Sequence, residues 1–389
     1  MVYLIRLGPL NETSLHMVIV TEAERPTQYE QYIARKYLPE LDGLRAFSIL
    51  IVVTVHMKDR VWEWLAGAQG VTVFFVLSGY LITLLALRET RFNGCLNVRA
   101  FFVRRVFRLF PSYYFVLGIY CVLVFGLNIS PERREGLARA LPYYLFYMQE
   151  YPVFRNLSTN LPFYQSWSLG IEEKFYLVWP FLAFSVLGSV RSVRAWATAG
   201  LTMLMIFAPT IIGQRAGQFL YPYSHILVGC LTAFVLDTPQ GFANLAWLGR
   251  RWGALLTLAG FLALHLIVPH VPKDVHRVFL SAYSVATGLL LMAIVLGDGP
   301  IQRVLRRPML VMIGKLSYGI YLVHILALHL AEKIATPGTD NPLVSIAALL
   351  LAYLFSVCAA YLLAMAIERP GIALGRRISR RLIGTGAAR

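Results

Sequence analysis

Hydrophobic residues occur in ten long stretches along the sequence, separated by short polar segments. Each stretch is close to the length of about 20 residues that an α-helix needs to cross the roughly 30 Å hydrocarbon core of a bilayer. The pattern therefore predicts an all-α, polytopic membrane helix bundle with about ten transmembrane helices. The predicted spans lie near Leu41–Met57, Val71–Leu87, Phe110–Leu127, Glu172–Leu187, Ala195–Gly213, Phe219–Leu236, Trp252–Pro269, Phe279–Gly297, Leu310–Leu330 and Leu343–Ile367.

The basic residues predict an orientation for this bundle. Segments between spans alternate between the two sides of the membrane, and 24 of the 36 lysines and arginines fall on one side, against 10 on the other. Because basic loops stay in the cytoplasm, both termini are predicted to be cytoplasmic. The chain then divides into an N-terminal cytoplasmic arm at 1–37, a membrane domain at 38–370 and a basic cytoplasmic tail at 371–389. The arm lacks the apolar core of a cleavable signal peptide.

The longest loop on the outer side runs from 128 to 165 and contains an aromatic run at 141–147. The run is too short to cross a membrane, and tyrosine prefers the level of the lipid headgroups. It predicts an interfacial or re-entrant helix.

Composition excludes several classes of protein. Hydrophobic residues make up 58% of the chain and charged residues 14%, which argues against a water-soluble enzyme and against disorder. The net charge of +16 is scattered over short loops, so it predicts contact with anionic membrane lipids and not with nucleic acid. The four cysteines form no CxxC pair and the histidines lie in separate spans, so we expect free thiols and no metal site.

Charged groups are expensive inside a membrane, and three ionisable residues share one face of the first span. At about 100° per residue, Asp42, Arg45 and His56 fall within about 40° of a common direction. His56 lies about 16 Å beyond Arg45 along a helix, near the bilayer midplane. A neutral imidazole at that depth can act as a general base. The simpler interpretation is an Asp42–Arg45 pair and a histidine that only bonds to another helix.

A pair of carboxylates begins the fourth span. Glu172 and Glu173 point about 100° apart on a helix, so at most one of them can face a given group. One could orient His56 or an acceptor hydroxyl, and Tyr176 lies one turn beyond. Alternatively, one of them stabilises the start of the helix and pairs with Lys174.

The ninth span places Ser317, Tyr321 and His324 on one face, where they could line a cavity or tie helices together. In the second span, Ser78 and Gly79 predict close packing of two helices. Ser78 does not lie in a GxSxG motif, the sharp turn that exposes the nucleophilic serine of many hydrolases, so a nucleophilic role is not predicted.

A basic segment at 99–111 alternates arginines with aromatic residues, as an amphipathic helix on anionic lipid does. Arg104, Arg105 and Arg108 are also spaced by three and four residues, so pairs of them can present forked donors to a phosphate. They predict a phosphorylated cosubstrate.

Taken together, these motifs resemble the acyltransferase-3 family of integral membrane O-acyltransferases. The resemblance covers residues 38–370. The matching segments follow the order of the family: residues 41–46 with His56, residues 70–83, Arg104 and Arg105 with Arg108 and Pro111, residues 167–180, residues 316–324 and residues 368–370. Thr72 and Lys174 depart from the residues common in the family, so no required charge is assigned to either.

The resemblance implies ten membrane helices and transfer of an acyl group, often acetyl, from acyl-CoA to a hydroxyl of a carbohydrate acceptor without a metal. The expected catalytic residues are His56, Glu172 and Glu173. The residues expected to bind acyl-CoA are Arg45, Arg104, Arg105 and Arg108. Six further residues are expected to bind substrate or to serve as structural polar groups: Asp42, Ser78, Tyr176, Ser317, Tyr321 and His324.

Several alternatives stay open from the sequence. The acceptor could be a sugar of a cell-surface polysaccharide or lipopolysaccharide, or a small glycoside such as a macrolide. A proton-coupled transporter would also place ionisable groups in the membrane, but the sequence shows no inverted repeat. A membrane scaffold would use the same groups only for packing. The expected location is a cell membrane, such as a bacterial inner membrane, and association into a homo-oligomer is left open.

Overall fold

The computed structural model describes residues 27–57, 60–188, 190–335 and 342–384, and within these ranges the regular structure is helical, without β-strands. The chain divides into two compact units, 1–37 and 38–389, and each is described by itself. In the first unit, α1 (Gln28–Ala34) begins with a capping box. The Thr27 hydroxyl accepts from the Glu30 N–H at 3.2 Å, and the Glu30 carboxylate accepts from the Thr27 N–H at 2.7 Å.

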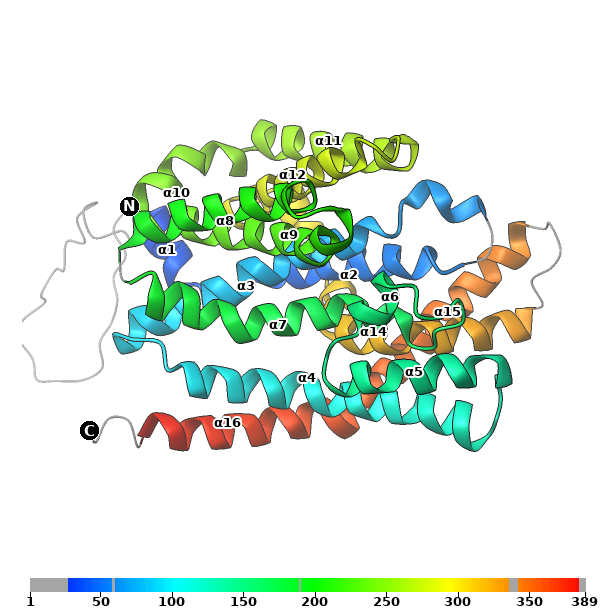
Figure 1. Cartoon of the computed structure of the whole chain (residues 1–389). Helices are drawn as coiled ribbons and strands as arrows, with labels where there is room; N and C mark the ends of the chain where they lie inside the picture. Colours follow the sequence, from blue (N-terminus) through cyan, green and yellow to red (C-terminus); the bar gives the residue numbers. More distant parts are fainter. Residues whose placement is uncertain (1–26, 58–59, 189, 336–341, 385–389) are drawn as a thin grey trace, which may run out of the picture. The chain divides into compact units, whose positions relative to one another are not determined.

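In the second unit, the longer helices run roughly along one direction and form a bundle (Figure 1). Its α-helices are α2 (Pro39–Thr54), α3 (Gln69–Asn93), α4 (Val98–Cys121), α5 (Arg134–Leu145), α6 (Glu150–Phe154), α7 (Trp167–Phe181), α8 (Arg191–Ile211), α9 (Gln214–Leu236), α10 (Pro239–Leu245), α11 (Arg251–Ile267), α12 (His276–Leu296), α13 (Pro300–Leu305), α14 (Pro308–Ala335), α15 (Pro342–Leu363) and α16 (Arg369–Gly384). Short 3₁₀ or π segments join several of them, including η5 (Tyr164–Ser166) and η9 (Ala364–Glu368).

Seven helical segments of the described chain are long and apolar enough to cross a membrane. They are Trp62–Asn93, Val98–Gly126, Gln214–Leu236, Arg251–His270, His276–Leu296, Pro308–Ala335 and Pro342–Ile383. The three remaining predicted spans correspond to α2, α7 and α8, of which α2 has 16 residues and α7 has 15. The all-helical membrane bundle is thus confirmed, while the count of ten spans stays a prediction.

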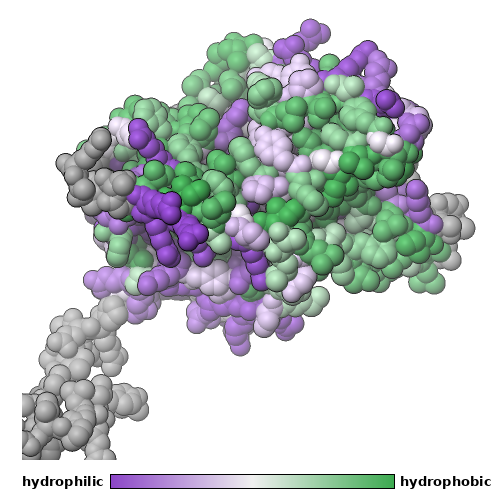
Figure 2. Space-filling view, turned by 90° about the horizontal axis from the view of Figure 1, so that it is seen from below, coloured by the Kyte–Doolittle hydropathy of each residue, from purple (hydrophilic) through white to green (hydrophobic). Residues whose placement is uncertain are grey.

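The surface of the bundle is suited to lipid. Phe115 of α4, Phe207 of α8, Leu256 of α11 and Leu350 of α15 are each more than half exposed. In Figure 2, hydrophobic residues cover much of the face seen from below, and hydrophilic residues gather in patches at its margins. A water-soluble protein would bury such side chains, so this distribution supports an integral membrane protein.

Glycines bring α3 and α9 into close contact. A Cβ atom at Gly79 would lie 1.8 Å from the Ile226 carbonyl oxygen, and one at Gly229 would lie 1.9 Å from the Val76 carbonyl oxygen. The two helices therefore come closest at these glycines, where the absence of a side chain leaves room for the backbone of the other helix. The close packing that we expected around Ser78 and Gly79 is confirmed.

The helical segment formed by α15, η9 and α16 is unusually long. It covers 42 residues from Pro342 to Ile383, or about 63 Å at 1.5 Å per residue, which is twice the thickness of the hydrocarbon core. The basic tail predicted from residue 371 continues this helix as α16, and its Gly375 packs against Phe107 of α4. Contact of α16 with lipid stays a prediction.

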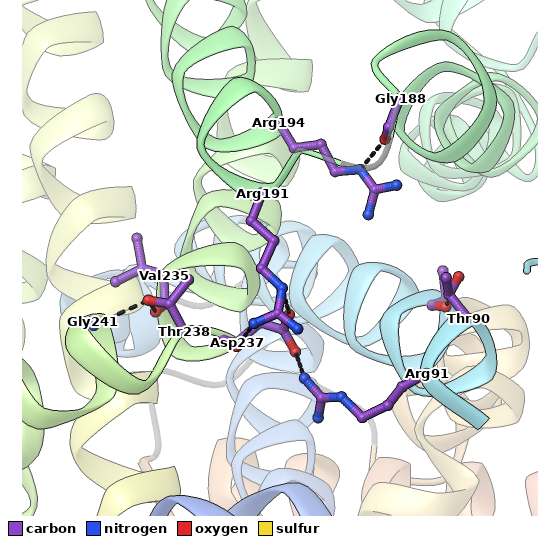
Figure 3. A network of polar contacts seen from close by, with 10 residues as sticks. Thr90, Arg91, Gly188, Arg191, Arg194, Val235, Asp237, Thr238 and Gly241 are labelled. Atoms are coloured by element: carbon purple, nitrogen blue, oxygen red, sulfur yellow. Dashed lines mark hydrogen bonds and ion pairs between the residues drawn. The ribbon is translucent and has the colours of Figure 1, made fainter. Parts of the chain in front are cut away.

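An ion-pair network ties three helices at one end of the bundle (Figure 3). The buried Asp237, just after α9, pairs with Arg91 of α3 at 2.6 Å and with Arg191 of α8 at 3.6 Å. Arg194 of α8 donates to the Gly188 carbonyl at 2.7 Å. These arginines therefore hold helix ends together.

Candidate active site

The chain leaves the helical path of α2 just before His56. The His56 N–H bonds to the Val53 carbonyl at 3.3 Å and does not continue the helix to the Val52 carbonyl. The Val52 oxygen instead lies 3.1 Å from Nδ1 of the His56 ring. The imidazole therefore caps a carbonyl at the C-terminal end of α2, and this bond fixes its orientation.

His324 of α14 fixes the tautomer of both rings when they are neutral. Nδ1 of His324 lies 2.8 Å from the Tyr321 carbonyl, which can only accept, so this nitrogen carries the hydrogen. The hydrogen on Nδ1 of His56 is then shared between the Val52 carbonyl at 3.1 Å and Nε2 of the fully buried His324 at 3.3 Å. His56 consequently holds its hydrogen on Nδ1, and its Nε2 keeps a lone pair for a substrate proton.

A cavity of about 470 Å³ opens beside His56. Most of its wall comes from the segment after α6 and from the end of α14. Its polar residues are His56, Arg133, Asn156, Ser158, Thr159, Asn160, Tyr164, His329 and Glu332. A lining this rich in hydrogen-bonding groups suits a hydroxylated molecule better than a lipid tail.

The segment between α5 and α6 turns inward and supports this wall. Gln149 and Glu150 are 0% and 3% exposed. Lys174 of α7 pairs with the Glu150 carboxylate at 2.8 Å and donates to the Tyr147 carbonyl at 2.8 Å. Gly170 leaves room for the turn, since a Cβ atom there would lie 2.4 Å from Oε1 of Gln149. The aromatic run that we expected to be interfacial or re-entrant thus ends in a buried polar turn.

A second group of residues surrounds Arg45, near the other end of α2. Arg45 lies 3.9 Å from Asp42, as the i,i+3 spacing predicts. Arg45, Arg105 and Arg108 are close enough to repel one another electrostatically, and Glu172 attracts the first two. We call Arg45, Arg105 and Arg108 the arginine cluster. Three positive charges at one site suit a phosphorylated ligand.

Glu172 is held beside this cluster by two hydroxyl groups. Its Oε2 atom lies 3.1 Å from the Ser78 hydroxyl and 3.0 Å from the Tyr176 hydroxyl, and the two hydroxyls also contact each other. Because each hydroxyl has one hydrogen, the two hydrogens are shared among these three contacts. The Arg105 guanidinium lies 5.1 Å from the centre of the Tyr176 ring. Ser78 and Tyr176 therefore position a carboxylate and a guanidinium next to each other.

A slot of about 60 Å³ lies between the arginine cluster and the His56–His324 pair. Its lining includes Arg45, Glu172, Ser168, Ser317 and Tyr321. The Tyr321 hydroxyl bonds to Ser168 at 2.7 Å, while the Tyr321 carbonyl holds His324. The hydroxyl of Ser317 is buried and has no hydrogen-bond partner among the described residues. Tyr321 therefore connects the slot with the histidine pair.

Two expectations need correction. We expected Glu172 or Glu173 to orient His56 or an acceptor hydroxyl, but the side chain that bonds to His56 is His324, so only the acceptor alternative stays a prediction. We also placed Arg104 with the ligand-binding arginines. Its guanidinium instead donates hydrogen bonds to Glu89 of α3 and, at 2.8 Å, to Ser379 of α16. Arg104 therefore links α4 to these two helices.

Sequence reasoning missed two features of the cavity. Tyr164 lies with its ring centre 5.7 Å from that of His56, and Lys174 fastens the turn at Glu150. Tyr164 directly precedes a polar motif, but one aromatic residue in a loop gives no periodic signal. Among the residues that the structure describes, no group of three histidine, cysteine or acidic side chains could hold a metal, and the four cysteines are free thiols.

Comparison with known proteins adds independent information. A family model described as an acyltransferase domain matches residues 38–365. A peptidoglycan O-acetyltransferase of Listeria monocytogenes is 30% identical over 77% of this chain and 50% of its own length. A putative peptidoglycan O-acetyltransferase of Bacillus subtilis is 29% identical over 81% and 52%. A putative O-acetyltransferase of Staphylococcus aureus is 28% identical over 76% and 51%.

This chain therefore spans about half the length of the curated relatives that it matches. No solved structure matches it.

Proposed function

Because this chain belongs to the acyltransferase-3 family of membrane acyltransferases, we propose that it transfers an acetyl group from acyl-CoA to a carbohydrate hydroxyl. The observation that carries the proposal is the His56–His324 pair at the wall of a polar cavity. A histidine with a fixed tautomer and one unprotonated nitrogen is suited to accept the proton of an attacking hydroxyl.

We place the donor at the arginine cluster. In the proposed orientation, with ten spans and both termini in the cytoplasm, this cluster faces the cytoplasm, where acyl-CoA is available. Arg105 and Arg108 would bind the phosphates, and the slot lined by Arg45, Ser317 and Tyr321 would take the thioester arm. The cavity beside His56 would open on the opposite side and take the acceptor.

The chemical step needs only groups that this arrangement holds. The acceptor oxygen attacks the thioester carbonyl carbon while Nε2 of His56 takes its proton, so that a C–O bond forms. The C–S bond then breaks, and the thiolate takes the proton from the imidazolium. The products are the ester and free coenzyme A. The imidazolium is stabilised by the negative end of the α2 dipole and by the Val52 carbonyl.

The class of acceptor follows from the cavity and from the relatives. The wall offers several side-chain amides and hydroxyls, which suit a sugar. Two of the relatives carry peptidoglycan O-acetyltransferase in their names. We therefore propose a cell-surface polysaccharide as the acceptor, with peptidoglycan as the first glycan to test.

The proposal is tested with the purified full chain in lipid nanodiscs, radiolabelled acetyl-CoA and a panel of glycans. Label should enter a glycan, with one free thiol released for each ester formed. His56→Ala should lower the transfer rate by about 10²- to 10⁴-fold, the usual contribution of a general base. His270→Ala, which removes an exposed histidine away from the cavity, is the matched control and should leave the rate unchanged. Equal rates for wild type and His56→Ala would exclude this mechanism.

A further inference from the structure

Among residues 162–166, only Tyr164 exposes a large part of its side chain at the cavity beside His56. Tyr164 is 40% exposed, whereas Phe163, Gln165 and Ser166 are at most 2% exposed. Pro162 and Phe163 also border the cavity but are buried, so Tyr164 offers the largest exposed surface of the segment to a ligand.

The backbone just before Tyr164 is held in an unfavourable conformation. Phe163 has φ 61° and ψ 19°, a left-handed conformation that is uncommon for a bulky residue. Its ring is packed against Tyr113, Tyr120 and Tyr144 at centroid distances of 5.5, 4.9 and 5.9 Å. The Tyr144 hydroxyl donates to the Pro162 carbonyl at 2.9 Å. Strain of this kind persists only where the surroundings determine the conformation, and it is common at functional sites.

The backbone after Tyr164 is fixed as well. The Ser166 hydroxyl donates to the Phe163 carbonyl at 2.7 Å, and the Gln165 amide donates to the Tyr120 hydroxyl at 3.2 Å. The Tyr321 hydroxyl donates to the Gln165 carbonyl. The backbone that carries Tyr164 is thus fixed on both sides before any substrate binds, which lowers the entropic cost of binding.

We propose that the Tyr164 ring is a stacking platform for a pyranose ring of the acceptor and presents one of its hydroxyls to His56. The ring centres of Tyr164 and His56 lie 5.7 Å apart with the planes tilted by 54°, so a sugar that contacts the Tyr164 ring lies beside the imidazole. A pyranose has an apolar face of C–H groups and hydroxyls along its edge. Asn156 and Asn160 offer amides to the remaining hydroxyls.

This inference rests on the proposed function and narrows its acceptor to sugars with a ring face. A phenylalanine at the same position keeps the platform and removes only the phenol. Burial raises the pKa of the Tyr164 phenol above its ordinary value, so an assay at neutral pH compares uncharged rings.

The test compares the Tyr164→Ala and Tyr164→Phe variants with wild type. Each protein is assayed with two acceptors, a peptidoglycan-type oligosaccharide and water. Transfer to water is measured as the release of free thiol in the absence of glycan. Tyr164→Ala should raise KM for the oligosaccharide about tenfold, the loss expected for one stacked ring, with thiol release into water unchanged. Tyr164→Phe should stay within about twofold of wild type. Tyr361→Ala removes a similarly exposed ring on α15, outside the cavity, and should change neither rate.

Two results would overturn the proposal. Equal losses with water and oligosaccharide would show that Tyr164 only shapes the protein. An unchanged KM in Tyr164→Ala would show that the sugar does not stack there. If Tyr164→Ala does not fold, Tyr164→Leu provides the same comparison, because leucine fills space without an aromatic face. Failure of the proposed function is seen separately, because wild type would then label no glycan.

Discussion

The two ends of the candidate site are held in different ways. Around His56, directions are set by uncharged hydrogen bonds, to Val52 and His324, and by ring packing around Phe163. In the arginine cluster, positions are set mainly by charge, and the side chains remain partly exposed. A proton transfer depends on angle as well as distance, whereas attraction to a phosphate depends mainly on distance. The structure is thus most constrained where direction matters most.

Separating Lys174 from Glu150 should have the largest effect, and on the His56 side only. Lys174→Met leaves an unpaired carboxylate at a position that is 3% exposed, and breaking a buried pair in this way costs about 3–5 kcal/mol. Thermal unfolding in detergent should show the loss, and the KM for the oligosaccharide should rise. The KM for acetyl-CoA should not change.

The matched control for this change removes both charges. Lys174→Met combined with Glu150→Gln leaves no uncompensated charge and should recover most of the stability. If the single and double variants unfold at the same temperature, the pair does not fasten the turn between α5 and α6, and the cavity wall depends on other contacts.

Removing the partner of His56 should have an intermediate effect. His324→Ala leaves Val52 as the acceptor for Nδ1 of His56, so we expect kcat to fall about 10²-fold with little change in either KM. His324→Gln offers an amide oxygen in place of the ring nitrogen and should recover part of the loss. For both variants, kcat is measured as the rate of thiol release at a saturating concentration of glycan. A kcat unaffected by His324→Ala would assign the orientation of His56 to Val52 alone.

The smallest effect is expected in the arginine cluster. Arg105→Ala should raise the KM for acetyl-CoA about tenfold, the size of one charge-assisted contact, and the difference should shrink as salt is added. Arg104→Ala is the matched control, because Arg104 bonds to Glu89 and Ser379. It should lower thermal stability and leave the KM for acetyl-CoA unchanged. The reverse pattern would show that the neighbouring arginines exchange roles.

The sequence predicted the parts of this arrangement that follow from helical periodicity. Whereas His56 follows the end of the helix, Asp42 and Arg45 share a face of α2 at any packing of the bundle, because their spacing alone decides it. The same holds for Ser317, Tyr321 and His324 along α14. Gly79 predicted a close approach because its missing side chain limits what can pack there.

Contacts between distant segments could not be predicted in this way. Arg104 and Arg105 are neighbours in sequence, and only the placement of α3 and α16 shows that Arg104 is occupied by Glu89 and Ser379. Glu172 carries the right chemistry to orient a histidine, but α7 places it beside Ser78. The role of Tyr164 depends on the conformation of Phe163, which no local pattern predicts.

One consequence of α2 concerns length. The helix covers about 14 Å along its axis from Arg45 to its last residue, Thr54, and His56 follows two residues later. A hydrogen-bonded helix hardly stretches. Because Nδ1 of His56 bonds back to the Val52 carbonyl of this helix, the helix sets the distance between the two side chains, and a molecule held at both ends must match that distance. The size of group that reaches the imidazole is then set by a count of backbone residues, whatever the walls of the slot permit.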